Sequence, residues 1–208
     1  MRIRTGGWVF LGALLMAVAG LAQADTLTGV LPTTPGGTNY QAYYDATTNL
    51  TWLANANMNG LTDWSQANSW AAGLDINGVT GWTLPTTADT SCIGINCTGS
   101  EMGYLFYDVL GGTAGHFLSN TGPFSNVQSD GYWSATGDAP STNYLAWEFD
   151  FYYGAQYIVN PSYGLFAWAV HAGDVGAPTS APEPGALALM LVGLGLVGFA
   201  ARRRLALR

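Results

Sequence analysis

The sequence predicts an α+β domain with two helices and an antiparallel sheet, followed by a C-terminal transmembrane helix. Residues 145–151 alternate large apolar side chains with polar ones, as a strand with one buried face does. Two segments, near 63–74 and 100–110, place apolar residues at helical spacing. The uncharged run 185–201 is apolar on every side and reaches the lower length limit for a membrane helix. Helices and strands that do not alternate regularly along the chain favour the α+β class.

A β-hairpin is expected near the start of the domain. Residues 25–38 are interrupted by proline and glycine, which indicates an extended entry segment. Residues 40–44 and 50–53 have the aromatic and apolar composition of strands, and the turn-forming residues 45–49 separate them.

Two helices are expected next. Thr62 and Asp63 are suitable N-cap residues for the first, and Gly73 and the pair 77–78 end it. Its apolar stripe consists of Ala67, Trp70, Ala71 and Leu74. Ser100 is a suitable N-cap for the second, which the glycine pair 111–112 ends. The stripe of this second helix consists of Met102, Leu105, Phe106 and Val109.

Strands are expected in the second half of the domain. Residues 81–86 form a short extended piece, and 131–136, 145–151 and 165–170 are strands. In the strand 145–151 the alternation places Trp147, Phe149 and Phe151 on one face. Its other face carries Glu148, Asp150 and Tyr152. In the whole order of hairpin, two helices and several antiparallel strands, the first strand of the hairpin and the last strand, 165–170, are free to pair with each other.

The N-terminal segment reads as a secretory signal peptide, residues 1–24. Arg2 and Arg4 precede the apolar run 8–21, and the small residues 22–24 fit a signal-peptidase site after Ala24. An uncleaved membrane anchor is the alternative. The mature domain then covers 25–174, and 175–181 is a linker to the C-terminal segment.

The C-terminal segment, 182–208, has three parts in a fixed order. A Pro-Glu-Pro motif is followed by the apolar run 185–201 and then by three arginines, which hold that end in the cytoplasm. The charged and proline residues of this segment are Pro182, Glu183, Pro184, Arg202, Arg203 and Arg204. The segment resembles the PEP-CTERM protein-sorting signal. The resemblance implies that an exosortase is a partner and that the C-terminal helix holds the protein in the inner membrane before processing. It also implies that the mature protein reaches the cell surface or extracellular matrix of a Gram-negative bacterium.

Charge is distributed very unevenly along the chain. All six basic residues lie in the two end segments, while 12 of the 13 acidic residues (all but Glu183) lie in the domain between them. The basic residues are Arg2, Arg4, Arg202, Arg203, Arg204 and Arg208. Nucleic acid is excluded as a partner of the domain, because phosphate binding needs cationic side chains. Anionic polymers are poor ligands unless a divalent cation bridges them.

Cys92 and Cys97 are the only cysteines. In an exported chain this spacing favours a local structural disulfide over a redox pair, which would prefer two intervening residues. A metal site would need more ligands than these two.

Six short aromatic motifs in order make the domain resemble the Lcl C-terminal-type domain. They lie at 44–52, 64–71, 81–86, 131–136, 146–149 and 167–170. The resemblance runs from about Tyr43 to Asp174 and implies a C-type-lectin-like fold that serves adhesion or ligand binding. Members commonly have arginine at the positions of Thr83 and His171, so binding of anionic glycans through basic residues is not expected of this chain.

The candidates for ligand or calcium contact are Glu148, Asp150, Tyr152 and Tyr132. Calcium prefers clustered oxygen ligands, which the pair Glu148 and Asp150 could supply, and the same pair could act as a glycosidase acid and base. A solvated sheet face is the third interpretation. No metal ligand set, catalytic residue or cofactor other than calcium is indicated. Exposed tyrosines suited to stacking on sugar rings are expected at Tyr132, Tyr144, Tyr152, Tyr153, Tyr157 and Tyr163.

These observations predict a non-enzymatic, exported cell-envelope or matrix protein. Exosortase processes it, and its lectin-like domain binds a neutral glycan or a surface protein. Two alternatives remain open: a carbohydrate-active enzyme that uses Glu148 and Asp150, and a structural matrix component without a specific ligand.

Overall fold

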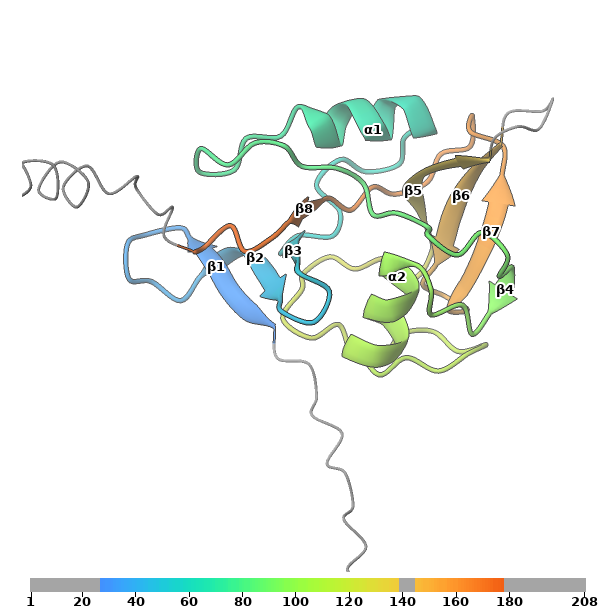
Figure 1. Cartoon of the computed structure of the whole chain (residues 1–208), viewed down its shortest axis with the longest axis horizontal. Coiled ribbons are helices and arrows are strands. Elements are labelled where there is room, and N and C mark those ends of the chain that lie inside the picture. The colour runs from blue at the N-terminus through green and yellow to red at the C-terminus, as the bar shows by residue number, and fades with distance from the viewer. Residues whose placement is uncertain (1–26, 139–144, 178–208) are drawn as a thin grey trace, which may run out of the picture.

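The computed structural model describes residues 27–138 and 145–177, which fold into two antiparallel sheets (Figure 1). One sheet has the strand order β1–β2–β3–β8 and the other has the order β4–β7–β6–β5. Strands of the first sheet are β1 (Thr28–Pro32), β2 (Tyr40–Asp45), β3 (Leu50–Leu53) and β8 (Val170–Ala172). Strands of the second sheet are β4 (Gly94–Ile95), β5 (Gly131–Asp138), β6 (Leu145–Asp150) and β7 (Ala155–Val159).

The helices are short. Helix α1 (Trp64–Ala72) has nine residues, and α2 (Glu101–Tyr104) has four before it continues as the single π-helical turn η1 (Leu105–Val109). The predicted caps are confirmed: Asp63 accepts from the Gln66 N–H, and Ser100 accepts from the Gly103 N–H. Ala67 and Ala71 are completely buried, so the small side chains of the stripe let α1 lie close to the core.

The predicted fold class, α+β with a C-type-lectin-like arrangement, is wrong. The described part is mostly β-sheet, because three segments that carry no clear alternation in sequence form the strands β1, β4 and β7. The second predicted helix keeps its expected extent, 101–109, but only its first four residues are α-helical. Its later part changes to i→i−5 bonding, with the Leu110 N–H donating to the Leu105 carbonyl at 2.9 Å.

Within residues 27–138 and 145–177 no helix is both long enough and apolar enough to cross a bilayer. The expected transmembrane helix 185–201, the signal peptide 1–24 and Tyr144 lie outside these described residues.

The predicted hairpin is confirmed, whereas the expected pairing of its first strand with the last strand is wrong, because β8 lies next to β3, the second strand of the hairpin. Strand β2 pairs with β3, and β3 pairs with β8, with Thr51 opposite His171. The predicted strand 165–170, however, is not one strand. Phe166 donates to the Gly131 carbonyl and accepts from the Trp133 N–H at the outer edge of β5. Val170 exchanges its two backbone hydrogen bonds with Thr83 and lies in register opposite Trp52 of β3. This segment therefore connects the two sheets.

Trp168 lies in the middle of that connecting segment and anchors the core. Its indole N–H donates to the Leu53 carbonyl at 2.8 Å. Its ring packs edge-on against Trp52 and Phe124 at centroid distances of 5.3 and 4.9 Å, which is favourable for aromatic pairs. The expectation that most tryptophans are core residues is confirmed, since five of them are at most 1 % exposed: Trp52, Trp82, Trp133, Trp147 and Trp168.

Many carboxylates of this lysine- and arginine-free domain hold turns. Asp45 accepts from the Thr47 N–H and Asp75 from the Gly78 N–H, and Asp174 accepts from the Gly176 N–H. Such bonds satisfy backbone donors at places where the chain reverses. The acidic composition therefore has a structural use that needs no cationic partner.

Candidate functional site

Strand β6 carries the predicted carboxylate pair, but the structure separates the environments of its two members. Glu148 lies between Trp133 on β5 and Tyr157 on β7 and is only 6 % exposed. Its Oε2 atom is buried and has no hydrogen-bond partner among the described residues. Gly131 leaves the space for this carboxyl group, because a Cβ atom there would overlap Glu148 Oε2. The interpretation of this sheet face as solvated is therefore wrong at Glu148.

Burial changes the protonation of this carboxyl group. It raises the pKa of Glu148 to about 8, and the nearby carboxylates of Asp150 and Asp130 raise it further. Burial also raises the pKa of Asp150, against the backbone N–H groups of Tyr152 and Tyr153, which lower it. Glu148 is thus mainly neutral at pH 7, while Asp150 is half-buried near the β6–β7 turn.

The calcium contact at Glu148 and Asp150 stays a prediction. Among the residues that the structure describes, no group of three or more His, Cys, Asp or Glu side chains could hold a metal ion. A calcium ion at Glu148 and Asp150 would thus need backbone, amide or solvent oxygens to complete its shell.

The two tyrosines of the predicted site lie in different environments. Tyr152 is 44 % exposed in the β6–β7 turn and packs edge-on against Tyr153 at a centroid distance of 4.6 Å.

Tyr132 is fully buried, and its hydroxyl accepts from the Gln128 N–H at 2.7 Å. Burial raises the pKa of this hydroxyl. The expectation that Tyr132 lies on the surface is wrong, because its ring fills the core beside Phe151, at 5.1 Å. The expected exposure of Tyr153, Tyr157 and Tyr163 is confirmed.

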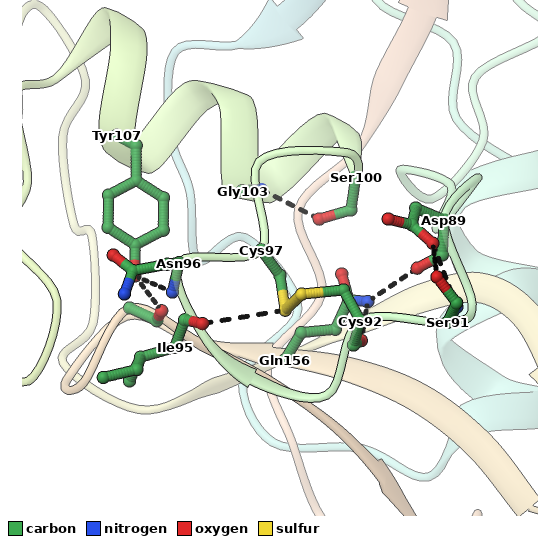
Figure 2. The surroundings of a disulfide bond; sticks show 11 residues. Asp89, Ser91, Cys92, Ile95, Asn96, Cys97, Ser100, Gly103, Tyr107 and Gln156 are labelled. Atoms are coloured by element: carbon green, nitrogen blue, oxygen red, sulfur yellow. Dashed lines mark hydrogen bonds between the residues drawn. A yellow bond between two sulfur atoms is a disulfide. The ribbon is translucent and has the colours of Figure 1, made fainter.

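The predicted disulfide between Cys92 and Cys97 is present and fixes the short edge strand β4 (Figure 2). Strand β4 pairs with β7, and Gln156 of β7 donates to the carbonyls of Asp89 and Cys92. From η1, the Tyr107 hydroxyl accepts from the Asn96 N–H and donates to the Gly154 carbonyl. The loop is therefore tied to both β7 and the helix.

Close approach of α2 to this loop depends on glycine. A Cβ atom at Gly103 would lie 1.9 Å from the Cys97 carbonyl oxygen. The helix can thus begin directly against the disulfide loop only because position 103 has no side chain.

Two of the surface cavities in the described part of the chain reach the size of small-molecule sites, which is about 300 Å³ or more. The α1 cavity, of about 350 Å³, lies at the start of helix α1. Its lining residues are Asp63, Trp64, Ser65, Pro161 and Ser162. The glycine-loop cavity, of about 300 Å³, follows η1. Its lining residues are Gly111, Gly112, Thr113, His116, Phe117 and Ser119.

Sequence reasoning found neither cavity. In the sequence, Asp63 is recognisable only as a helix cap and Trp64 only as part of an aromatic motif. Pro161 and Ser162 belong to a turn almost 100 residues further along the chain. The bond from the Trp64 N–H to the Pro161 carbonyl, at 3.0 Å, brings the two segments together. No local signal in the sequence indicates that contact.

The positions at which this chain departs from the expected arginines are neighbours in space. Thr83 and Val170 exchange two backbone hydrogen bonds, and His171 follows Val170 directly. The His171 ring packs edge-on against Trp82 at 5.6 Å, and its Nδ1 atom is buried without a partner among the described residues. This corner of the domain is therefore aromatic and carries no arginine or lysine.

Together, the fold and these sites define a small disulfide-linked β domain with ligand-sized cavities and exposed aromatic side chains. The chain belongs to the Lcl C-terminal domain family, whose model matches residues 41–171. Residues 180–204 match the PEP-CTERM protein-sorting motif, which marks the chain as an exported protein that exosortase processes. No curated protein and no solved structure matches the chain significantly.

Proposed function

We propose that this chain is a non-enzymatic adhesion or binding protein of the cell envelope or extracellular matrix of a Gram-negative bacterium. Exosortase processing releases or displays its domain, which binds a neutral glycan or another surface protein in a lectin-like manner. The observation that carries this proposal is the combination of the sorting motif with a rigid domain whose exposed side chains include several tyrosines. Tyrosine and tryptophan at a surface supply apolar contact together with hydrogen bonding.

The charge distribution supports a neutral ligand. The domain has no lysine or arginine, so sulfated or phosphorylated polymers would meet only carboxylates. Hydroxyl groups of a neutral sugar can instead donate to those carboxylates, while the C–H face of the ring packs on an aromatic side chain.

Two measurements test the proposal separately. The intact mass of the exported protein, from cells with and without exosortase, tests processing; a species that ends near Pro184 only when the enzyme is present is expected. Titration of the exported protein with neutral glycans, with and without calcium, tests binding. Absence of any binding would leave export intact but would refute the glycan-binding form of the function.

One observation favours a second candidate, a carbohydrate-active enzyme. The raised pKa of Glu148 is what a general acid needs at neutral pH. Against this candidate, neither the α1 cavity nor the glycine-loop cavity is lined by Glu148 or Asp150. Glu148→Gln with unchanged turnover of a glycan substrate would remove it. A structural matrix component is the third candidate, which a deletion strain with altered biofilm texture but normal glycan adhesion would favour.

A further inference from the structure

We propose that the α1 cavity is the sugar-binding site of this domain and that it takes one ring of a neutral polysaccharide. This inference rests on the glycan-binding function proposed above. It adds the place of binding, the residues that contact the sugar and the exclusion of anionic sugars.

The lining of the α1 cavity is fixed before any ligand arrives. The Trp64 indole N–H donates to the Ser134 carbonyl at 2.7 Å, and the Trp64 backbone N–H donates to the Pro161 carbonyl at 3.0 Å. In the other segment that lines the cavity, the Ser162 N–H donates to Asn160 Oδ1 at 2.9 Å. A site held in this way loses little conformational entropy when it binds, which favours affinity.

The chemistry of the lining matches a ring that has both apolar and hydroxylated faces. Trp64 and Pro161 supply apolar surface. Asp63 uses Oδ1 to cap α1 through the Gln66 N–H, and its side chain is partly exposed in the cavity lining. Ser65 and Ser162 are exposed and add two hydroxyl groups. The polar side chains of the cavity are thus hydroxyls and a carboxylate, which pair well with sugar hydroxyls.

Charge selects against an anionic sugar at this site and gives a cationic one no specific partner. An anionic sugar would meet Asp63 in a domain that has no lysine or arginine to compensate. A cationic polymer would be attracted by the negative charge of the whole domain rather than by this cavity, where one carboxylate oxygen already holds the helix start, and high salt would weaken that attraction. A neutral ring therefore fits this lining best.

The test uses the exported protein, purified from cells, in native gels that contain one polysaccharide each. The neutral probes are dextran, galactomannan and mixed-linkage glucan, and the charged probes are alginate and glycol chitosan. Retardation is measured at low and at high salt. We expect a neutral probe to retard the protein equally at both, since binding to an uncharged ligand is not screened.

Three variants locate the site. Ser162→Trp fills the α1 cavity, and Ser119→Trp is its matched control, because it places the same side chain on an exposed serine of the glycine-loop cavity. Asp63→Ser keeps an N-cap but removes the carboxylate. Ser162→Trp should weaken binding at least tenfold and Asp63→Ser about tenfold, which corresponds to one charged hydrogen bond. Ser119→Trp should bind like the wild type.

Each other outcome overturns the proposal. If Ser162→Trp binds like the wild type, or if only Ser119→Trp loses binding, the site is wrong while the glycan-binding function stands. If only a charged probe retards the wild type, or none does, both the site and the glycan-binding function are wrong. Near-UV circular dichroism checks folding, and if Ser162→Trp does not fold, the result with Asp63→Ser decides.

Discussion

Glu148 should make the stability of the domain fall as the pH rises from weakly acidic to weakly alkaline. The carboxyl group is buried, its Oε2 atom has no partner, and burial raises its pKa from 4.5 to about 8. Between these two values the folded state holds a proton that the unfolded chain has released, so each pH unit reduces the free energy of unfolding. The stabilisation is complete below pH 4.5, is lost through the window up to 8, and does not change further above it.

The size of the effect follows from the width of that window. One pH unit corresponds to 1.36 kcal/mol for one proton, so the full window amounts to at most about 5 kcal/mol. This is comparable to the whole stability of a small domain, which is about 5–15 kcal/mol. Asp150 contributes in the same direction, because its pKa is also raised by burial.

Urea unfolding followed by tryptophan fluorescence, from about pH 5 to about pH 9, measures this dependence. Glu148→Gln replaces the carboxyl group by a neutral group of the same shape and should flatten most of the slope. Asp108→Asn is the matched control, because Asp108 is exposed, and it should leave the slope unchanged. A wild-type stability that rises over this pH range, or an equal slope in Glu148→Gln and the wild type, would refute the reasoning.

Three further predictions concern the packing. The double change Cys92→Ser and Cys97→Ser opens a loop closed over a sequence separation of 5 and should lower the free energy of unfolding by about 2 kcal/mol. Hydrogen exchange should become faster at Gly94 and Ile95, where β4 pairs with β7. Unchanged exchange there would contradict the role of the disulfide in holding β4. Gly103→Ala should lower the free energy of unfolding in urea by about 1–3 kcal/mol, because its Cβ atom meets the Cys97 carbonyl. Gly164→Ala should lower it much less, since the nearest contact of its Cβ atom is 3.7 Å away. Equal losses in the two variants would contradict the close approach at Gly103. Trp168→Phe leaves the buried Leu53 carbonyl without the indole N–H and should lower the free energy of unfolding by about 1–3 kcal/mol. Thermal unfolding should show a smaller loss for Trp70→Phe, because Trp70 is half-buried. Equal losses in the two variants would refute the importance of the bond to Leu53.

The sequence predicts those elements whose signals are local. The caps at Asp63 and Ser100, the hairpin of β2 and β3 and the disulfide all depend on residues within a few positions of one another, and all are present. Strand β7 was not predicted because Gln156, a polar residue, is buried to bond the disulfide loop, which breaks the expected pattern of burial.

The candidate site was harder to predict for a related reason. Alternation along β6 correctly separates Phe149 from Glu148, but it gives no information on what covers each face. Here Gly131 leaves room for the carboxyl group, Leu165 lies beside that glycine, and neither residue belongs to β6. The α1 cavity likewise arises from a contact between Trp64 and Pro161 that only the folded chain makes.

The use of carboxylates as turn caps has a consequence for the environments in which this protein can act. Bonds such as those from the Thr47 N–H to Asp45 and from the Gly78 N–H to Asp75 are local and short, so dissolved ions hardly weaken them. Repulsion among the many like charges of the domain is long-ranged, and ions screen it. Brackish or saline water should therefore strengthen this fold, whereas very dilute fresh water should be its most demanding habitat.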